Sequence, residues 1–259
     1  MLMVLSPSKG QEFDHPAPPF AHTIPDHLEQ SVRLIGELKK LTQPDLRQLM
    51  DISDKIADLN VKRYRAFSVP FTPENARQAL FAFKGDVYSR IPADSYSRKD
   101  LAYAQDHLRI LSGLYGTLRP LDLIQPYRLE MKTRLKTTAG DNLYDFWGER
   151  ITQSLNAAMA ALEETPVLVN LASTEYFKAI KPKKLTGRLL TLHFKEIKNG
   201  KSRVIAIFAK RARGMMAHFM IKNRIKNPEE IKQFDTAGYR FSTGDSDADN
   251  WRFVRPQPS

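Results

Sequence analysis

The stretch DHLRILSGLYGTLRPLD, residues 106–122, closes a helical pattern with two glycines that lie three positions apart. The helical pattern begins at Ser97, whose spacing from Asp100 is that of a capping box. Its apolar face consists of residues that recur at helical spacing, namely Leu101, Ala104, Leu108 and Leu111. The pattern stops at Gly113 and Gly116 follows, so the stretch predicts a helix that ends in a glycine-rich turn.

A glycine-rich turn suits a phosphate group, because glycine lets backbone N–H groups approach an oxyanion closely and adopts positive φ. The segment near residues 98–131 resembles the helix-hairpin-helix motif that contacts the DNA backbone. Two residues separate the glycines where that motif usually has one, and Pro120 restricts where a second helix can begin. The alternative is a corner between two helices that contains two left-handed glycines. The residues that would grip phosphate are Gly113, Gly116, Thr117 and Arg119.

The positive charge of the chain is concentrated in one segment. The 259 residues carry a formal net charge of +11. Residues 178–232 hold 16 Lys and Arg against 3 Asp and Glu, whereas residues 1–177 and 233–259 each have a net charge of −1. Clustered charge of one sign repels itself, and a polyanionic partner is the usual reason for it. The alternative is a solvated surface that serves solubility alone.

Cations in and near this segment predict a contact surface for duplex DNA. Residues 181–184 form a stiff basic segment, Lys-Pro-Lys-Lys. Residues 210–213 follow a predicted strand at 203–208 and precede a predicted helix, whose free N–H groups would add to the side-chain charge. The predicted phosphate contacts outside the turn are Lys132, Lys181, Lys183, Lys184, Lys210, Arg211 and Arg213. No predicted helix presents Asn, Gln and Arg together for base edges, so we expect binding without sequence preference.

Short apolar runs separated by amphipathic segments predict an α/β fold. Residues 2–5 and 167–169 have the character of buried strands, and residues 189–194 and 203–208 read as two strands joined by a hairpin loop. A hairpin combined with parallel strands predicts a mixed parallel and antiparallel sheet flanked by many helices. The chain has no internal repeat and no long linker, so we expect one domain over residues 1–259.

Polar side chains follow two of the predicted strands, at the ends where parallel strands commonly line a site. Ser6 and Lys9 follow the first strand, and Asn170, Ser173 and Glu175 follow the second. These five residues predict a pocket for an enzyme that acts on a nucleotide or a damaged base, with Glu175 as general base or ribose ligand. The alternative assigns Ser6 and Lys9 to a plain turn and Ser173 to a helix cap.

The composition argues against several other kinds of site. The chain has no cysteine, and its six histidines lack metal-ligand spacing, so we predict neither a disulfide nor a metal site. It contains no Walker loop and no G-x-G-x-x-G motif, and we expect no cofactor. It shows no signal peptide and no apolar run of membrane-spanning length. We therefore expect a cytoplasmic monomer with no membrane partner.

Five segments together resemble the YaaA family of bacterial peroxide stress resistance proteins. They are residues 5–9, 83–88, 111–131, 170–184 and 210–214. Ser8 stands where the common form of the family has Ala. The resemblance implies a cytoplasmic protein of unusual mixed α/β fold that protects DNA during hydrogen peroxide stress, partly by limiting unincorporated iron. It also implies binding of duplex DNA through a basic cleft and a helix-hairpin-helix-like element, while leaving open whether the chain is an enzyme.

Overall fold

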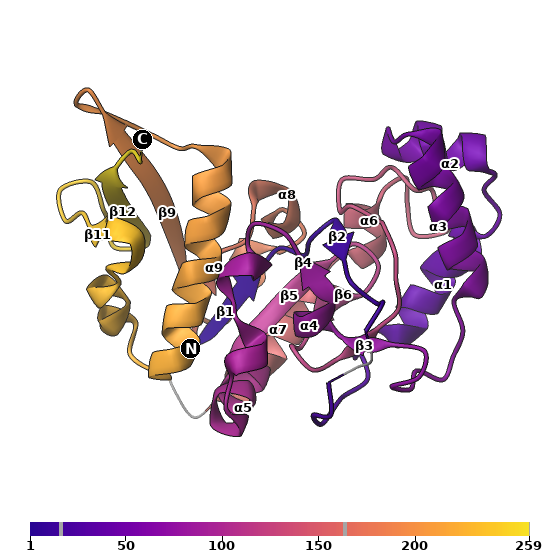
Figure 1. Ribbon diagram of the computed structural model, residues 1–259, viewed down its shortest axis with the longest axis horizontal. Coiled ribbons are helices and arrows are strands. Elements are labelled where there is room, and N and C mark those ends of the chain that lie inside the picture. Colours follow the sequence, from indigo (N-terminus) through magenta and orange to yellow (C-terminus); the bar gives the residue numbers. More distant parts are fainter. Residues whose placement is uncertain (16–17, 163–164, 259) are drawn as a thin grey trace.

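A mixed sheet of eight strands lies at the centre of the described part of the chain (Figure 1). The computed structural model describes residues 1–15, 18–162 and 165–258. The strand order is β11-β12-β9-β8-β1-β5-β6, and β10 pairs with β9. The strands are β1 Leu2–Leu5, β5 Leu108–Ser112, β6 Gly116–Leu118, β8 Val167–Asn170, β9 Arg188–Lys198, β10 Lys201–Arg203, β11 Arg240–Phe241 and β12 Asn250–Pro256. From β12 to β5 all neighbours are parallel, whereas β6, β10 and β11 are antiparallel to their partners, which confirms the predicted mixed α/β fold.

Burial explains why these apolar runs form strands. Every residue of β1 and β8 is buried, as expected for parallel strands covered on both faces. In β9 the residues Leu190, Leu192, Phe194 and Glu196 are buried and alternate with more exposed neighbours. One face of β9 therefore packs on the core while the other lies near solvent.

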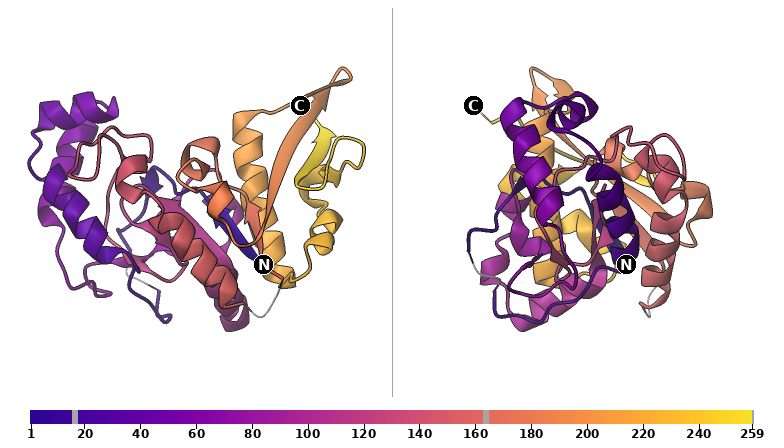
Figure 2. Two further views of the ribbon diagram at one scale, coloured as in Figure 1. Left: turned by 180° about the vertical axis from the view of Figure 1, so that it is seen from behind. Right: turned by 90° about the vertical axis from the view of Figure 1, so that its right-hand side faces the viewer.

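Helices cover the sheet and extend the molecule at both ends (Figures 1 and 2). They are α1 Leu28–Leu38, α2 Gln43–Met50, α3 Asp54–Ala66, α4 Ala79–Ala82, α5 Arg98–His107, α6 Leu143–Trp147, α7 Arg150–Ala160, α8 Thr174–Phe177 and α9 Ala206–Asn223. Helices α1, α2 and α3 cluster at one end, and α9 lies beside β9 at the other (Figure 1). Helix α5 contacts β1 and β5, and α7 covers the opposite face of the sheet (Figure 2).

Short elements complete the fold around the ends of the central strands. Two small antiparallel pairs join β2 Gly10–Gln11 to β4 Phe83–Lys84, and β3 Arg77–Gln78 to β7 Leu123–Ile124. The short 3-10 helices are η1 Tyr88–Arg90, η2 Ala93–Ser95, η3 Pro182–Lys184, η4 Pro228–Gln233 and η5 Thr236–Gly238. The pair of β2 and β4 lies between the two ends of the molecule (Figure 1).

The structure corrects the helix-hairpin-helix-like element expected near residues 98–131. The capping box of Ser97 and Asp100 forms as predicted, but α5 ends at His107. Residues Leu108–Ser112 are strand β5, which pairs with β1 on one side and, through a hairpin, with β6 on the other. A buried strand and the last turn of a buried helix share an apolar pattern, and the hydrogen bonds to β1 decide between them here.

The structure also corrects the strand expected at residues 203–208. Strand β10 covers Lys201–Arg203, and α9 already begins at Ala206. Residues 210–213 therefore lie inside α9, where backbone N–H groups bond within the helix and none is free for an anion. Only their side chains are available to a ligand.

Candidate nucleic-acid interface

The carboxyl ends of β1 and β8 are joined by two serines. Ser173 N donates to Ser6 Oγ at 2.8 Å, and Ser6 Oγ donates to Ser173 Oγ at 3.2 Å. The phenol of Tyr88 donates to the carbonyl of Ser6 at 2.9 Å. The two chain segments that follow the strands are therefore fixed against each other, and they form the floor of a pocket.

This pocket has a volume of about 580 Å³ and contains most of the residues predicted for it. Ser6, Lys9, Ser173 and Glu175 all line it. Asn170 does not: it is buried, and its Oδ1 accepts a hydrogen bond from Ala172 N at 2.9 Å. The amide of Asn170 thus stabilises the turn after β8, which corrects its predicted place in the pocket.

Two carboxylates of the pocket are held in different ways. Glu175 Oε1 accepts a hydrogen bond from the backbone N–H of Lys132 at 3.3 Å. Glu130 lies between two cations, with Lys9 Nζ 2.9 Å from Oε1 and Arg128 Nη2 3.3 Å from Oε2. Burial raises the pKa of Tyr176, which lines the same pocket, well above its ordinary value, so its phenol is neutral.

One face of α9 supplies further cations to the pocket. Lys210 and Arg213 are three residues apart in the helix, so they project from the same side, and both line the pocket. Arg211 points elsewhere and pairs with Asp86, with Nε 3.1 Å from Oδ1. Burial lowers the pKa of Arg213, and its Nε is buried without a hydrogen-bond partner among the described residues.

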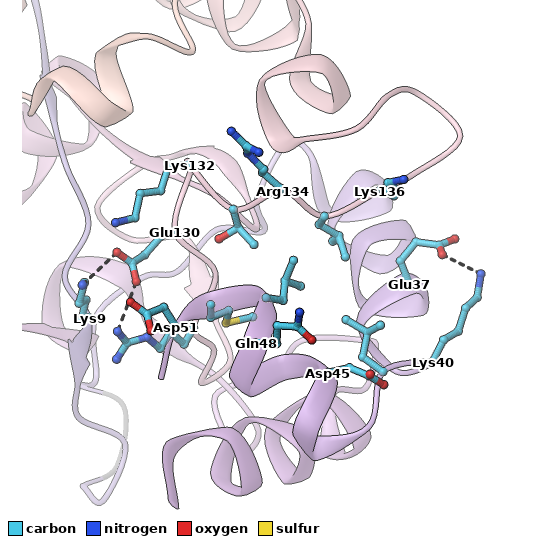
Figure 3. Close-up of a pocket in the computed structure, with 16 residues that line it drawn as sticks. Lys9, Glu37, Lys40, Asp45, Gln48, Asp51, Glu130, Lys132, Arg134 and Lys136 are labelled. Atoms are coloured by element: carbon cyan, nitrogen blue, oxygen red, sulfur yellow. Dashed lines mark hydrogen bonds and ion pairs between the residues drawn. The ribbon is translucent and has the colours of Figure 1, made fainter. Parts of the chain in front are cut away.

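A second, larger pocket of about 830 Å³ continues from the first (Figure 3). Lys9, Glu130 and Lys132 line both pockets, so the two form one surface, which we call the groove. One wall of the larger part comes from the segment after Glu130, and the opposite wall comes from α1, α2 and the loop between them. The apolar residues of that opposite wall are Leu41, Leu49 and Met50.

Three cations form a row along one wall of the groove (Figure 3). In residues 131–136 the side chains alternate between buried Met131, Thr133 and Leu135 and exposed Lys132, Arg134 and Lys136. The predicted contacts include Lys132 but neither Arg134 nor Lys136. A period-two alternation of apolar and cationic residues is the signal in the sequence that identifies them.

The turn residues predicted to grip phosphate lie under the surface. Gly113, Gly116 and Thr117 are all buried. Trp147 Nε1 donates to Gly113 O at 3.0 Å, and a Cβ added at Gly116 would lie 2.7 Å from the Trp147 ring. Gly116 thus packs against the indole, whereas Gly113 packs against the backbone of Leu129 and Glu130.

The remaining predicted contacts lie outside both parts of the groove. Arg119 pairs with Asp26 at 3.1 Å and with Asp122 at 3.0 Å. Lys184 pairs with Glu149. Lys181 and Lys183 belong to the same basic segment around η3, and Lys183 is exposed.

Within residues 1–15, 18–162 and 165–258, no three His, Asp or Glu side chains come together as metal ligands. In the same ranges no helix has the length and apolar character that crossing a membrane requires.

The fold and the groove define a mixed α/β protein with a cation-lined groove beside the carboxyl ends of its parallel strands. The family model described as "Peroxide stress protein YaaA" matches residues 1–244. UPF0246 protein AM1_4276 of Acaryochloris marina is 52% identical over 255 residues, which cover 98% of this chain and 100% of that protein. The chain belongs to the peroxide stress protein YaaA family, and this confirms the resemblance noted in its sequence.

Proposed function

We propose that this chain binds duplex DNA along the groove, without strong sequence preference, and so helps to protect DNA from oxidative damage. The observation that carries the proposal is the exposed row of Lys132, Arg134 and Lys136 on one wall. None of these three side chains forms an ion pair with another described residue, so their charge is free for a polyanion. Cations that meet phosphates release counterions from DNA, which supplies affinity independent of base sequence.

The shape of the groove supports the same proposal. Lys9 and Lys132 lie where its two parts join, and Lys210 and Arg213 continue the positive surface onto α9. Cations from segments far apart in the sequence therefore face one hollow. Phosphates of a bound strand would meet side chains along its whole length.

The proposal is tested by measuring the affinity for a fluorescein-labelled random duplex by anisotropy over a series of salt concentrations. We expect log Kd to rise linearly with log salt concentration, and the double variant Arg134→Ala/Lys136→Ala to reduce that slope by about 2. The control Lys55→Ala/Lys62→Ala removes the same charge from α3, outside the groove, and should leave the slope unchanged. A flat salt response, or no binding at low salt, would refute DNA binding.

The family membership adds a cellular part to the proposal. We place the chain in the cytoplasm as a monomer, where it lowers DNA damage under hydrogen peroxide and limits unincorporated iron. Expression of the chain in a bacterial strain that lacks its own family member should restore survival under peroxide and lower the iron measured by electron paramagnetic resonance. If expression restored survival but left the concentration of unincorporated iron unchanged, the two roles would be separate.

A second candidate function is an enzyme that acts on a nucleotide or a damaged base. It is favoured by the convergence of Ser6, Lys9, Ser173 and Glu175 on one pocket beside the cations of α9. A carboxylate and hydroxyls in one cavity suit general acid–base chemistry. The test is chromatography of nucleotides and of oligonucleotides with oxidised bases after incubation with the chain. Product that appears with the chain and disappears with Glu175→Gln would support catalysis.

A further inference from the structure

The part of the groove between α9 and the ends of β1 and β8 combines two cations of α9 with hydroxyl and carboxylate side chains. We infer that this pocket binds a single unpaired nucleotide of the bound DNA, with its phosphate held by Lys210 and Arg213. The inference rests on the proposed DNA binding and goes further, because it predicts that DNA with an unpaired nucleotide binds better than intact duplex. The proposed ligand consists of one phosphate, one sugar and one base that is not paired.

Arg213 carries the argument for a phosphate. Its side chain is partly buried and lines the pocket, and its Nε has no hydrogen-bond partner among the described residues. It forms no ion pair within the described ranges either. A guanidinium withdrawn from water without an anion is unfavourable, and a phosphate supplies both the charge and a bidentate acceptor.

The carboxylates around the pocket do not neutralise Arg213. Asp86 is occupied by Arg211 at 3.1 Å, and Glu130 by Lys9 at 2.9 Å. Glu175 accepts a hydrogen bond from the backbone N–H of Lys132 and forms no ion pair with Arg213. Lys210, on the same face of α9 as Arg213, is exposed and also lacks an ion pair among the described residues. A positive site for one anion therefore remains at the α9 side.

The rest of the pocket suits a sugar and a base. Its volume of about 580 Å³ falls in the range of small-molecule sites and is too small for a duplex. Apolar surface comes from Pro7, Val87 and Leu171, and Tyr176 also lines the pocket. Ser6, Ser173 and Glu175 supply hydroxyl and carboxylate groups that can bond to the edge of a base only when no partner base covers it.

The residues that line both pockets connect the larger part of the groove to the proposed nucleotide pocket. Lys132 and Lys9 belong both to the groove wall and to this pocket. A strand whose phosphates follow Lys136, Arg134 and Lys132 arrives at the opening of the pocket. One nucleotide can then turn out of the stack while its neighbours stay on the cations.

The experiment compares two labelled DNAs: an intact duplex and the same duplex with one extrahelical 2-aminopurine nucleotide. We expect the full-length chain to bind the second DNA about tenfold more tightly, as one additional charge-assisted contact predicts. The 2-aminopurine fluorescence should rise as the base leaves the stack. Free dTMP at millimolar concentration should lower that fluorescence while the anisotropy of the DNA stays high, because it competes for the pocket alone.

Two variants separate the pocket from the groove. Arg213→Gln should abolish the preference for the extrahelical nucleotide, so that this variant binds the two DNAs with equal affinity, while Arg213→Lys should restore part of the preference. Arg134 lies outside the pocket, so Arg134→Ala should lower the affinity for both DNAs by the same factor. Circular dichroism of each variant should match that of the wild-type chain, as a check that the variant is folded.

The outcomes distinguish this inference from the proposal beneath it. Equal affinity of the wild-type chain for the two DNAs, with unchanged 2-aminopurine fluorescence, would overturn the nucleotide pocket and leave DNA binding intact. Binding of free dTMP without any preference between the DNAs would overturn the DNA source of the nucleotide. Binding of neither DNA at low salt would overturn both proposals.

Discussion

Ser173 N donates a hydrogen bond to Ser6 Oγ at 2.8 Å, which ties the end of β8 to the end of β1. The two residues are 167 positions apart, yet they form one floor beneath the pocket. The same Ser6 hydroxyl donates to Ser173 Oγ, and the Ser6 carbonyl accepts from Tyr88. The positions of Ser6 and Ser173 in the pocket therefore depend on a small hydrogen-bond network at the edge of the sheet.

Removal of the Ser6 hydroxyl should loosen this floor. Ser6→Ala leaves Ser173 N without its acceptor, so we expect the free energy of unfolding to fall by about 1 kcal/mol. Urea denaturation measures the change. Ser8→Ala is the matched control, because Ser8 Oγ accepts from Gly10 N at 3.2 Å at an exposed site, and it should change stability by less than about 0.5 kcal/mol. Equal losses in both variants would contradict the network.

Asp100 should make stability depend on pH in the acid range. Its buried carboxylate pairs with Lys222 at 2.8 Å and Arg224 at 3.1 Å, which joins α5 to the end of α9. The hydrogen bond from Lys222 lowers the pKa of Asp100 from 3.8 to about 2. Because the folded state lowers this pKa, the stabilisation is full above pH 3.8 and is lost as the pH falls toward about 2.

The variant Asp100→Asn should therefore cost about 2 kcal/mol at neutral pH and flatten the acid dependence of unfolding. The control Asp58→Asn removes an exposed pair with Lys62 on α3 and should change stability by less than about 0.5 kcal/mol. Thermal unfolding at several pH values checks both. An Asp100→Asn protein that keeps the wild-type acid profile would show that another carboxylate governs it.

Gly214 lies where α9 packs against Val87, the residue before η1. A Cβ at this position would stand 2.0 Å from the carbonyl oxygen of Val87, which lines the pocket. Gly214→Ala should cost at least about 2 kcal/mol, since backbone must move. Gly36→Ala in α1 meets no atom within 4 Å and should stabilise the protein by about 0.5 kcal/mol. The two melting temperatures should shift in opposite directions, and a shift in one direction would refute the contact.

Buried tyrosines should limit stability in the alkaline range. Burial raises the pKa of Tyr88, Tyr115 and Tyr127 above the ordinary value of 10.0. A pKa raised by folding means that the stabilisation is full below pH 10.0 and is lost as the pH rises beyond it. The ultraviolet absorbance of tyrosinate should therefore rise later in the native chain than in urea. Simultaneous ionisation of all nine tyrosines near pH 10 in the native chain would contradict this.

The sequence alone was sufficient to predict those features that depend on residues close together in the chain. The capping box of Ser97 and Asp100 forms, and the apolar runs at the start of β1 and β8 are strands. The meeting of Ser6 with Ser173 also follows from sequence, since carboxyl ends of parallel strands share one edge. Each of these depends on spacing along the chain or on a general rule of sheets.

The tertiary structure alone decided the features that depend on partners distant in the sequence. Residues 108–112 fit a helix or a strand by pattern, and the hydrogen bonds from β1 make them β5. The glycines at 113 and 116 suit a phosphate or close packing, and here the backbone at Leu129 fills the space at Gly113 and the Trp147 ring fills that at Gly116. A charge count placed the cations near the end of the chain, whereas burial of Met131 and Leu135 turned Arg134 and Lys136 toward the groove. Sequence thus determined which groups are present, and packing between remote segments determined which of them face a ligand, because only the folded chain excludes water from one side of a residue.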